Sequence, residues 1–192
     1  MNGEEKVMDS VFQRLYTEYQ QDVFQFLIYL VKNRDTAEDL MQEVFIRVMK
    51  SHQQFKGKSS EKTWLFSIAK NVAIDHFRKQ STIKKRVMEK FDWSKREIVA
   101  DAPMPQEIAE QNEDIRKLYH CLNYCTTDQK LVVVMRYIQD LTIAETADVL
   151  GWTEGKVKTT QHRAIKQLRE LMTNNREEEE NSERVKMERS RH

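Results

Sequence analysis

The sequence predicts an all-α protein made of two small helical domains joined by a flexible linker. Gly (4) and Pro (2) are scarce among the 192 residues, which disfavours sandwiches and barrels because those folds need frequent chain reversals. Apolar residues recur at helical spacing in two long parts of the chain. The segment between them loses that periodicity and holds both prolines, Pro103 and Pro105. Two compact halves therefore fit the chain better than one.

The first half opens with two predicted helices. Residues 9–32 have a wide apolar face, formed by Val11, Leu15, Tyr19, Val23, Phe26, Leu27 and Leu30. Asp35 with Glu38 three residues later is a capping signal for the second helix. Its apolar stripe is Ala37, Leu40, Met41, Val44, Phe45, Val48 and Met49. Its opposite face carries Glu38, Asp39, Gln42, Glu43 and Arg47, which by default is a solvated surface.

A third helical stretch follows the polar loop 53–60. Its apolar positions are Trp64, Leu65, Ile68, Val72 and Phe77, and its basic edge is Lys70, Arg78, Lys79, Lys84, Lys85 and Arg86. Cations interleaved with aromatics beside a Gly/Ser loop are what single-stranded DNA binding needs. The helical spacing of Trp64 and Phe77, however, favours a place in the core over a role in base stacking.

We predict domains at 1–82 and 108–172, a linker at 83–107 and a charged tail at 173–192 that is disordered or a frayed helix. Helical pattern resumes over 108–124 and again over 126–138, where Thr126 and Gln129 have capping-box spacing.

Residues 142–170 have the pattern of a helix-turn-helix. Thr142 and Glu145 form a capping box, and Ala147, Gly151 and Val157 supply the small residue, the turn and the packing residue. Thr153 can cap the second helix. The inward positions of that helix are Val157, Ala164, Leu168 and Leu171, which leaves a polar and cationic face typical of a recognition helix: Lys156, Lys158, Thr159, His162, Arg163 and Lys166. The alternative is an ordinary helical hairpin with a basic surface.

Charge is distributed unevenly although the formal net charge is only +1. Residues 50–90 hold eleven Lys/Arg against three Asp/Glu, and residues 91–128 hold four against eight. Cys121 and Cys125, one turn apart, are expected to be buried thiols of a reducing compartment, and His120 beside them is a weak metal candidate. The polar N-terminus and the short apolar run 23–31 predict a cytoplasmic protein without membrane insertion. We expect no metal and no cofactor.

Residues 9–82 and 108–172 together resemble the extracytoplasmic-function sigma factors, the group that keeps only the second and fourth conserved sigma regions. AEDLMQEVFIRVMKSHQQF is similar to the family's core-binding helix, SSEKTWLFSIAKNVAIDHFRKQ to its promoter-melting segment and GKVKTTQHRAIKQLR to its recognition helix. The last two tracts resemble the sigma-X branch of Gram-positive bacteria. Two departures stand out. Glu61 occupies the place of a usual Phe, and CTT (125–127) replaces a usual Leu-Pro.

The resemblance implies a chain that binds core RNA polymerase and promoter DNA, both duplex and melted, and that catalyses nothing itself. It leaves the existence of an anti-sigma factor open. The polymerase-binding residues it implies are Asp39, Gln42, Glu43 and Arg47. Those for the minus-ten element are Gln54, Lys56, Lys58, Ser59, Ser60, Lys62, Trp64, Lys70, Arg78 and Lys79. Those for the minus-thirty-five element are Lys156, Lys158, Thr159, His162, Arg163 and Lys166.

Two other classes of function are weighed against this one. A stand-alone helix-turn-helix regulator, whose N-terminal half senses a ligand or dimerises, would bind duplex DNA without polymerase. A small helical enzyme is disfavoured, because the sequence has no Gly-rich phosphate loop, no metal-ligand spacing and no paired carboxylates on a cleft-like segment.

Overall fold

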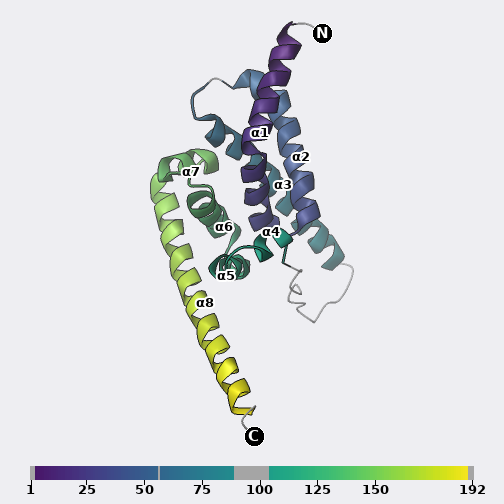
Figure 1. Cartoon of the computed structure of the whole chain (residues 1–192). Coiled ribbons are helices and arrows are strands. Elements are labelled where there is room, and N and C mark those ends of the chain that lie inside the picture. The colour runs from purple at the N-terminus through teal and green to yellow at the C-terminus, as the bar shows by residue number, and fades with distance from the viewer. Residues whose placement is uncertain (1–2, 56, 89–103, 190–192) are drawn as a thin grey trace.

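The computed structural model describes residues 3–55, 57–88 and 104–189, and over these ranges it is helical without strands, as the sequence predicts (Figure 1). The elements in chain order are α1 (Gly3–Val31), α2 (Arg34–Ser51), the short turn η1 (His52–Gln54), α3 (Glu61–Met88), α4 (Gln106–Ala109), α5 (Glu113–Cys121), η2 (Leu122–Tyr124), α6 (Thr127–Val133), the π-helical turn η3 (Val134–Ile138), α7 (Ile143–Leu150) and α8 (Glu154–Arg189). Residues 89–103, the middle of the predicted linker, lie outside the described residues.

The chain reverses between α1 and α2 at Lys32, whose φ is 58°. The N-cap of α2 is Asn33, whose side chain accepts a hydrogen bond from the backbone N–H of Thr36 at 2.8 Å. The predicted cap at Asp35 is therefore wrong by two residues. Asp35 instead lies in the first turn of α2, where its negative charge interacts favourably with the positive end of the helix dipole.

The apolar stripe of α2 is buried against α1 and α3 as predicted at Ala37, Leu40, Val44, Phe45 and Val48. Met49 departs from the prediction, because its side chain is 44% exposed. Each residue advances a helix by about 100°, so Met49 turns away from the core that its neighbour Val48 enters.

The second half confirms the predicted helix starts. Thr126 with Gln129 and Thr142 with Glu145 both form complete capping boxes. The helix expected over 108–124 is interrupted, because Asn112 caps a new helix, α5, by accepting from the backbone N–H of Ile115 at 2.9 Å.

The predicted charged tail, expected to be disordered or a frayed helix, is helical from Thr173 to Arg189, and residues 190–192 lie outside the described residues. The backbone of α8 continues as helix to Arg189 and extends away from the body of the molecule (Figure 1). The tail lacks Gly and Pro and is rich in Glu and Arg, which are good helix formers.

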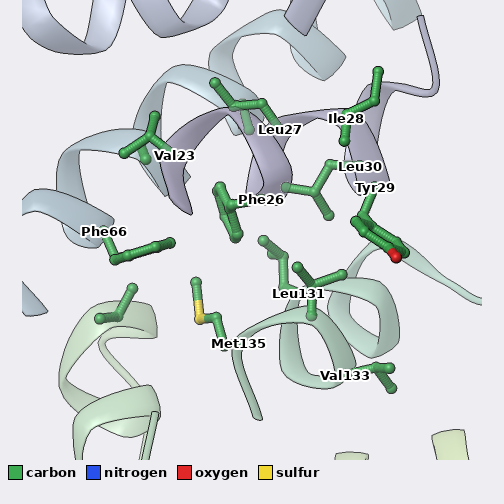
Figure 2. Close-up of a cluster of buried hydrophobic side chains, with 14 of the residues drawn as sticks. Val23, Phe26, Leu27, Ile28, Tyr29, Leu30, Phe66, Leu131, Val133 and Met135 are labelled. Atoms are coloured by element: carbon green, nitrogen blue, oxygen red, sulfur yellow. The ribbon is translucent and has the colours of Figure 1, made fainter. Parts of the chain in front are cut away.

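The two halves pack on each other, which the sequence analysis did not predict. Phe26 of α1 and Phe66 of α3 meet edge to face at 5.3 Å between ring centroids, and Met135 of η3 lies beside them (Figure 2). The Nε2 of Gln139, a residue only 2% exposed, donates to Oε1 of Gln25 in α1 at 3.3 Å. One continuous apolar core thus spans both halves.

Cys121 and Cys125 are buried thiols, as expected, and burial raises the pKa of both. His120 beside them is exposed. Among the described residues, no cluster of three or more His, Cys, Asp or Glu could hold a metal ion. Over the same residues, no helix has the length and apolar character needed to cross a bilayer.

Candidate polymerase and nucleic-acid interfaces

The outer face of α2 combines acidic and apolar side chains. Asp39 and Gln42 are exposed and Glu43 is half-buried. Ile46 and Met49, 48% and 44% exposed, follow Asp39 and Gln42 at steps of seven residues, which keeps them on the same side of the helix. Exposed large apolar side chains within a polar rim are typical of a protein-binding surface.

The sequence analysis missed Ile46 and assigned Met49 to the core. The seven-residue steps from the polar positions Asp39 and Gln42 were the signal that could have found both. We call the surface formed by Asp39, Gln42, Glu43, Ile46 and Met49 the α2 docking face.

Arg47 borders the α2 docking face and is partly engaged within the molecule. Its Nη2 donates to Oε1 of Glu43 at 2.5 Å and lies 3.4 Å from Oδ2 of Asp75 in α3. Arg47 therefore fixes the orientation of Glu43 and links α2 to α3.

The loop between η1 and α3 is anchored on Trp64. The rings of Phe55 and Trp64 lie 5.0 Å apart, and His52 meets Trp64 edge to face at 6.1 Å. Gly57 has a φ of 66°, a left-handed conformation that glycine adopts without strain. Trp64 is half-buried against the core, as its helical spacing predicted.

The polar residues predicted to meet the minus-ten element differ in exposure. Lys58, Ser60, Arg78 and Lys79 are exposed, and Ser59 is half-buried. Lys56 lies outside the described residues, and Gln54 is described by its backbone alone. Two lysines are less available for contact with DNA. Lys62 is paired with Asp22, with 3.4 Å between Nζ and Oδ2. Lys70 is half-buried, and burial lowers the pKa of its ammonium group.

The helix-turn-helix of α7 and α8 is confirmed. Gly151 ends α7 in the left-handed conformation, and Thr153 Oγ1 accepts from the backbone N–H of Lys156 at 3.2 Å to cap α8. Ala147 and Val157 are 5% and 0% exposed and lie in the buried core. A small residue on α7 thus allows the second helix to approach closely.

All six predicted minus-thirty-five residues lie on the exposed side of α8: Lys156, Lys158, Thr159, His162, Arg163 and Lys166. Lys156 is held near the body of the domain, with its Nζ 3.5 Å from the centroid of the Trp152 ring and 3.9 Å from Oδ2 of Asp128. Thr159 and Arg163 line one shallow depression together with Gln129 of α6. A cationic face at the N-terminal end of an exposed helix is the arrangement that reads a DNA major groove.

Comparison with known proteins assigns both halves. Residues 15–83 match the model of sigma-70 region 2, and residues 122–170 match the model of sigma-70 region 4. The chain is also 50% identical over 182 residues to the ECF RNA polymerase sigma factor SigX of Bacillus subtilis, which covers 95% of this chain and 93% of that protein. The chain belongs to the extracytoplasmic-function (ECF) sigma factors. Its resemblance to the sigma-X branch is thereby confirmed.

Two further relatives agree with this assignment. The sigma factor is 32% identical over 176 residues to the RNA polymerase sigma factor YlaC of Bacillus subtilis, covering 91% of this chain and 98% of that one. Its structure resembles that of the sigma factor RpoE of Bartonella quintana, solved in complex with the anti-sigma factor NepR. The TM-score is 0.66 at 25% identity, over 84% of this chain and 96% of the other.

Proposed function

We propose that this sigma factor binds core RNA polymerase and directs initiation at promoters that carry minus-thirty-five and minus-ten elements. Residues 108–172 read the first element as duplex, and residues 1–82 hold the melted strand of the second. The chain performs no covalent step, since RNA synthesis belongs to the polymerase. We also place its action in the cytoplasm, a reducing compartment, which accords with Cys121 and Cys125 being reduced thiols.

The α2 docking face is the observation that carries this proposal. A stand-alone regulator would use a face with exposed Ile46 and Met49 to dimerise, whereas an ECF sigma factor would use it to bind polymerase, and the chain belongs to the second class. Acidic residues steer a basic partner, and desolvated apolar side chains at the centre of an interface supply affinity. We propose polymerase contacts for this face and for Arg47 at its border.

The first experiment measures binding of full-length variants to purified core polymerase. Asp39→Lys and Met49→Gln change exposed side chains at opposite ends of the face, so folding should be preserved. Each should weaken binding by about tenfold or more, which corresponds to about 1.4 kcal/mol. Glu170→Lys, a charge reversal at an exposed position of α8, is the matched control and should bind like the unmodified chain.

Unchanged affinity in both Asp39→Lys and Met49→Gln would contradict docking through α2. Run-off transcription with core polymerase then tests the function itself. If the unmodified chain binds promoter duplex but supports no initiation with core enzyme, the stand-alone regulator is the better description.

The DNA roles rest on the two exposed surfaces described above. For the minus-thirty-five element we propose the exposed residues of α8, with Arg163 and Thr159 nearest the depression beside α6. For the minus-ten strand we propose the loop anchored on Trp64 together with the exposed cations Lys58, Arg78 and Lys79. Because the related RpoE was solved with an anti-sigma factor, we propose that an anti-sigma protein also controls this chain.

A further inference from the structure

Glu61, the first residue of α3, directly follows the loop proposed to hold the minus-ten strand. Its carboxylate accepts two hydrogen bonds from the guanidinium of Arg14 in α1. Nη2 lies 2.7 Å from Oε1 and Nη1 lies 2.9 Å from Oε2. This two-pronged geometry is the strongest form of Arg–carboxylate pairing. Glu18, one turn after Arg14, supports it with a contact of 3.3 Å to the same guanidinium.

The neighbouring residue makes a second link between the same two helices. Lys62 Nζ lies 3.4 Å from Oδ2 of Asp22, so two consecutive residues at the start of α3 are paired with α1. At its other end, the loop is anchored by the contact of Phe55 with Trp64. The end of the loop that leads into α3 is therefore held to α1 by ion pairs and capped by Ser60, whose Oγ accepts from the backbone N–H of Thr63 at 3.0 Å. The end that leaves η1 is held by aromatic packing.

The pairing of Arg14 with Glu61 also removes a source of electrostatic repulsion between the chain and DNA. Hydrogen bonding to Arg14 lowers the pKa of Glu61, so this side chain is an anion at neutral pH. An uncompensated carboxylate at the edge of a loop that meets DNA phosphates would repel them. Arg14 is 48% exposed and sits between Glu61 and Glu18, where its positive charge offsets the negative charge of Glu61.

Resting on the proposed function of the loop, we propose that Arg14 is a positioning residue for promoter opening: it neutralises the charge of Glu61 at the α3 end of the loop. Arg14 acts through Glu61 and does not itself contact DNA. The effect of losing Arg14 should accordingly depend on whether residue 61 carries a charge.

The test compares Arg14→Gln, Glu61→Gln and the double variant as full-length chains with core polymerase. Open-complex formation is followed on duplex promoter and on a template already mismatched across the minus-ten region. Arg14→Gln should open duplex promoter about threefold to tenfold less well, because it leaves Glu61 unpaired. The double variant should recover most of this loss, and Arg14→Lys, which keeps the charge, should lose little.

Three measurements separate this role from a merely structural one. Core-polymerase affinity and melting temperature should stay close to those of the unmodified chain, because an exposed ion pair contributes little to stability. The defect of Arg14→Gln relative to the unmodified chain should shrink as salt rises from about 0.05 M to about 0.3 M, because salt screens the unpaired Glu61. Arg116→Gln, at an exposed position of α5, is the matched control and should open promoters normally.

Three outcomes would overturn the proposal: normal opening by Arg14→Gln, a double variant no better than Arg14→Gln, or a defect that does not change with salt. The second outcome would show that Arg14 does not act through the charge of Glu61. If the unmodified chain initiates on neither template with core polymerase, the proposed function fails first, and that result is distinct from all three.

Discussion

Replacing Gly151 with alanine tests the turn of the helix-turn-helix. Gly151 has a φ of 67°. Its backbone N–H donates to the carbonyl of Asp148 at 3.3 Å, and the backbone N–H of Trp152 donates to the carbonyl of Ala147 at 2.9 Å. An added Cβ would meet nothing within 4 Å, so the cost of Gly151→Ala is conformational alone. A left-handed non-glycine residue costs about 1 to 2 kcal/mol. The melting temperature, followed by circular dichroism, should fall by about 2 to 4 °C for each kcal/mol lost in a chain of this size.

Gly155→Ala is the matched control and should change stability in the opposite direction. Gly155 lies in the first turn of α8, and the nearest atom to an added Cβ is Thr153 Oγ1 at 4.0 Å. Alanine is favoured over glycine in a helix by up to about 1 kcal/mol, so this variant should melt at a higher temperature. If both variants moved the melting temperature in the same direction, the left-handed turn at Gly151 would not be the cause, and the reasoning would be refuted.

Three further predictions follow from the contacts. The backbone N–H of Thr142 donates a hydrogen bond to the Glu145 carboxylate, and this lowers the pKa of Glu145 in the folded chain. The ionised carboxylate therefore stabilises the fold above the unfolded pKa of about 4.3, and this stabilisation is lost as pH falls through the lower pKa of the folded state. The difference in melting temperature between Glu145→Gln and the unmodified chain should therefore shrink from neutral to strongly acidic pH, and a constant difference would contradict this. A fragment of residues 108–172 exposes Met135 and should self-associate in sedimentation, whereas a stable monomer would argue against the packing between halves. Fluorophores at exposed Gln80 and Glu170 should move apart when the promoter complex forms, and an unchanged transfer efficiency would contradict separation of the halves.

Local rules were sufficient wherever the deciding interactions lie within one or two turns of chain. The capping boxes at Thr126 and Thr142, the cap at Thr153 and the turn at Gly151 all depend on residues three or four positions apart. The same rules failed at Asn33. Two capping side chains, Asn33 and Asp35, stand within two residues of each other, and the reversal at Lys32 decides between them.

The packing between the halves depends on contacts between residues distant in sequence, yet the sequence of α1 indicates that this helix is covered on more than one side. Five consecutive residues from Phe26 to Leu30 are all buried, which one apolar face of a helix cannot explain. A helix that is apolar all round is covered on all sides. Helices α2 and α3 cover one part of α1, and the second half of the chain covers another part through α6 and η3. Periodicity indicates that such a helix is buried but not which segment buries it.

The packing of α7 on α3 bears directly on how the proposed function can work. Packed helices lie about 8 to 10 Å apart, so the two proposed DNA-reading surfaces stand on neighbouring elements. The nominal minus-thirty-five and minus-ten positions differ by about 25 base pairs, or roughly 85 Å of duplex at about 3.4 Å per base pair. One chain cannot read both elements of straight duplex while α7 remains on α3, so the halves must separate when the promoter is engaged. Separation of the halves exposes the apolar side chains of Phe26, Phe66 and Met135 to water, which is unfavourable. We therefore expect a binding partner that covers this apolar surface, rather than thermal motion alone, to separate the halves.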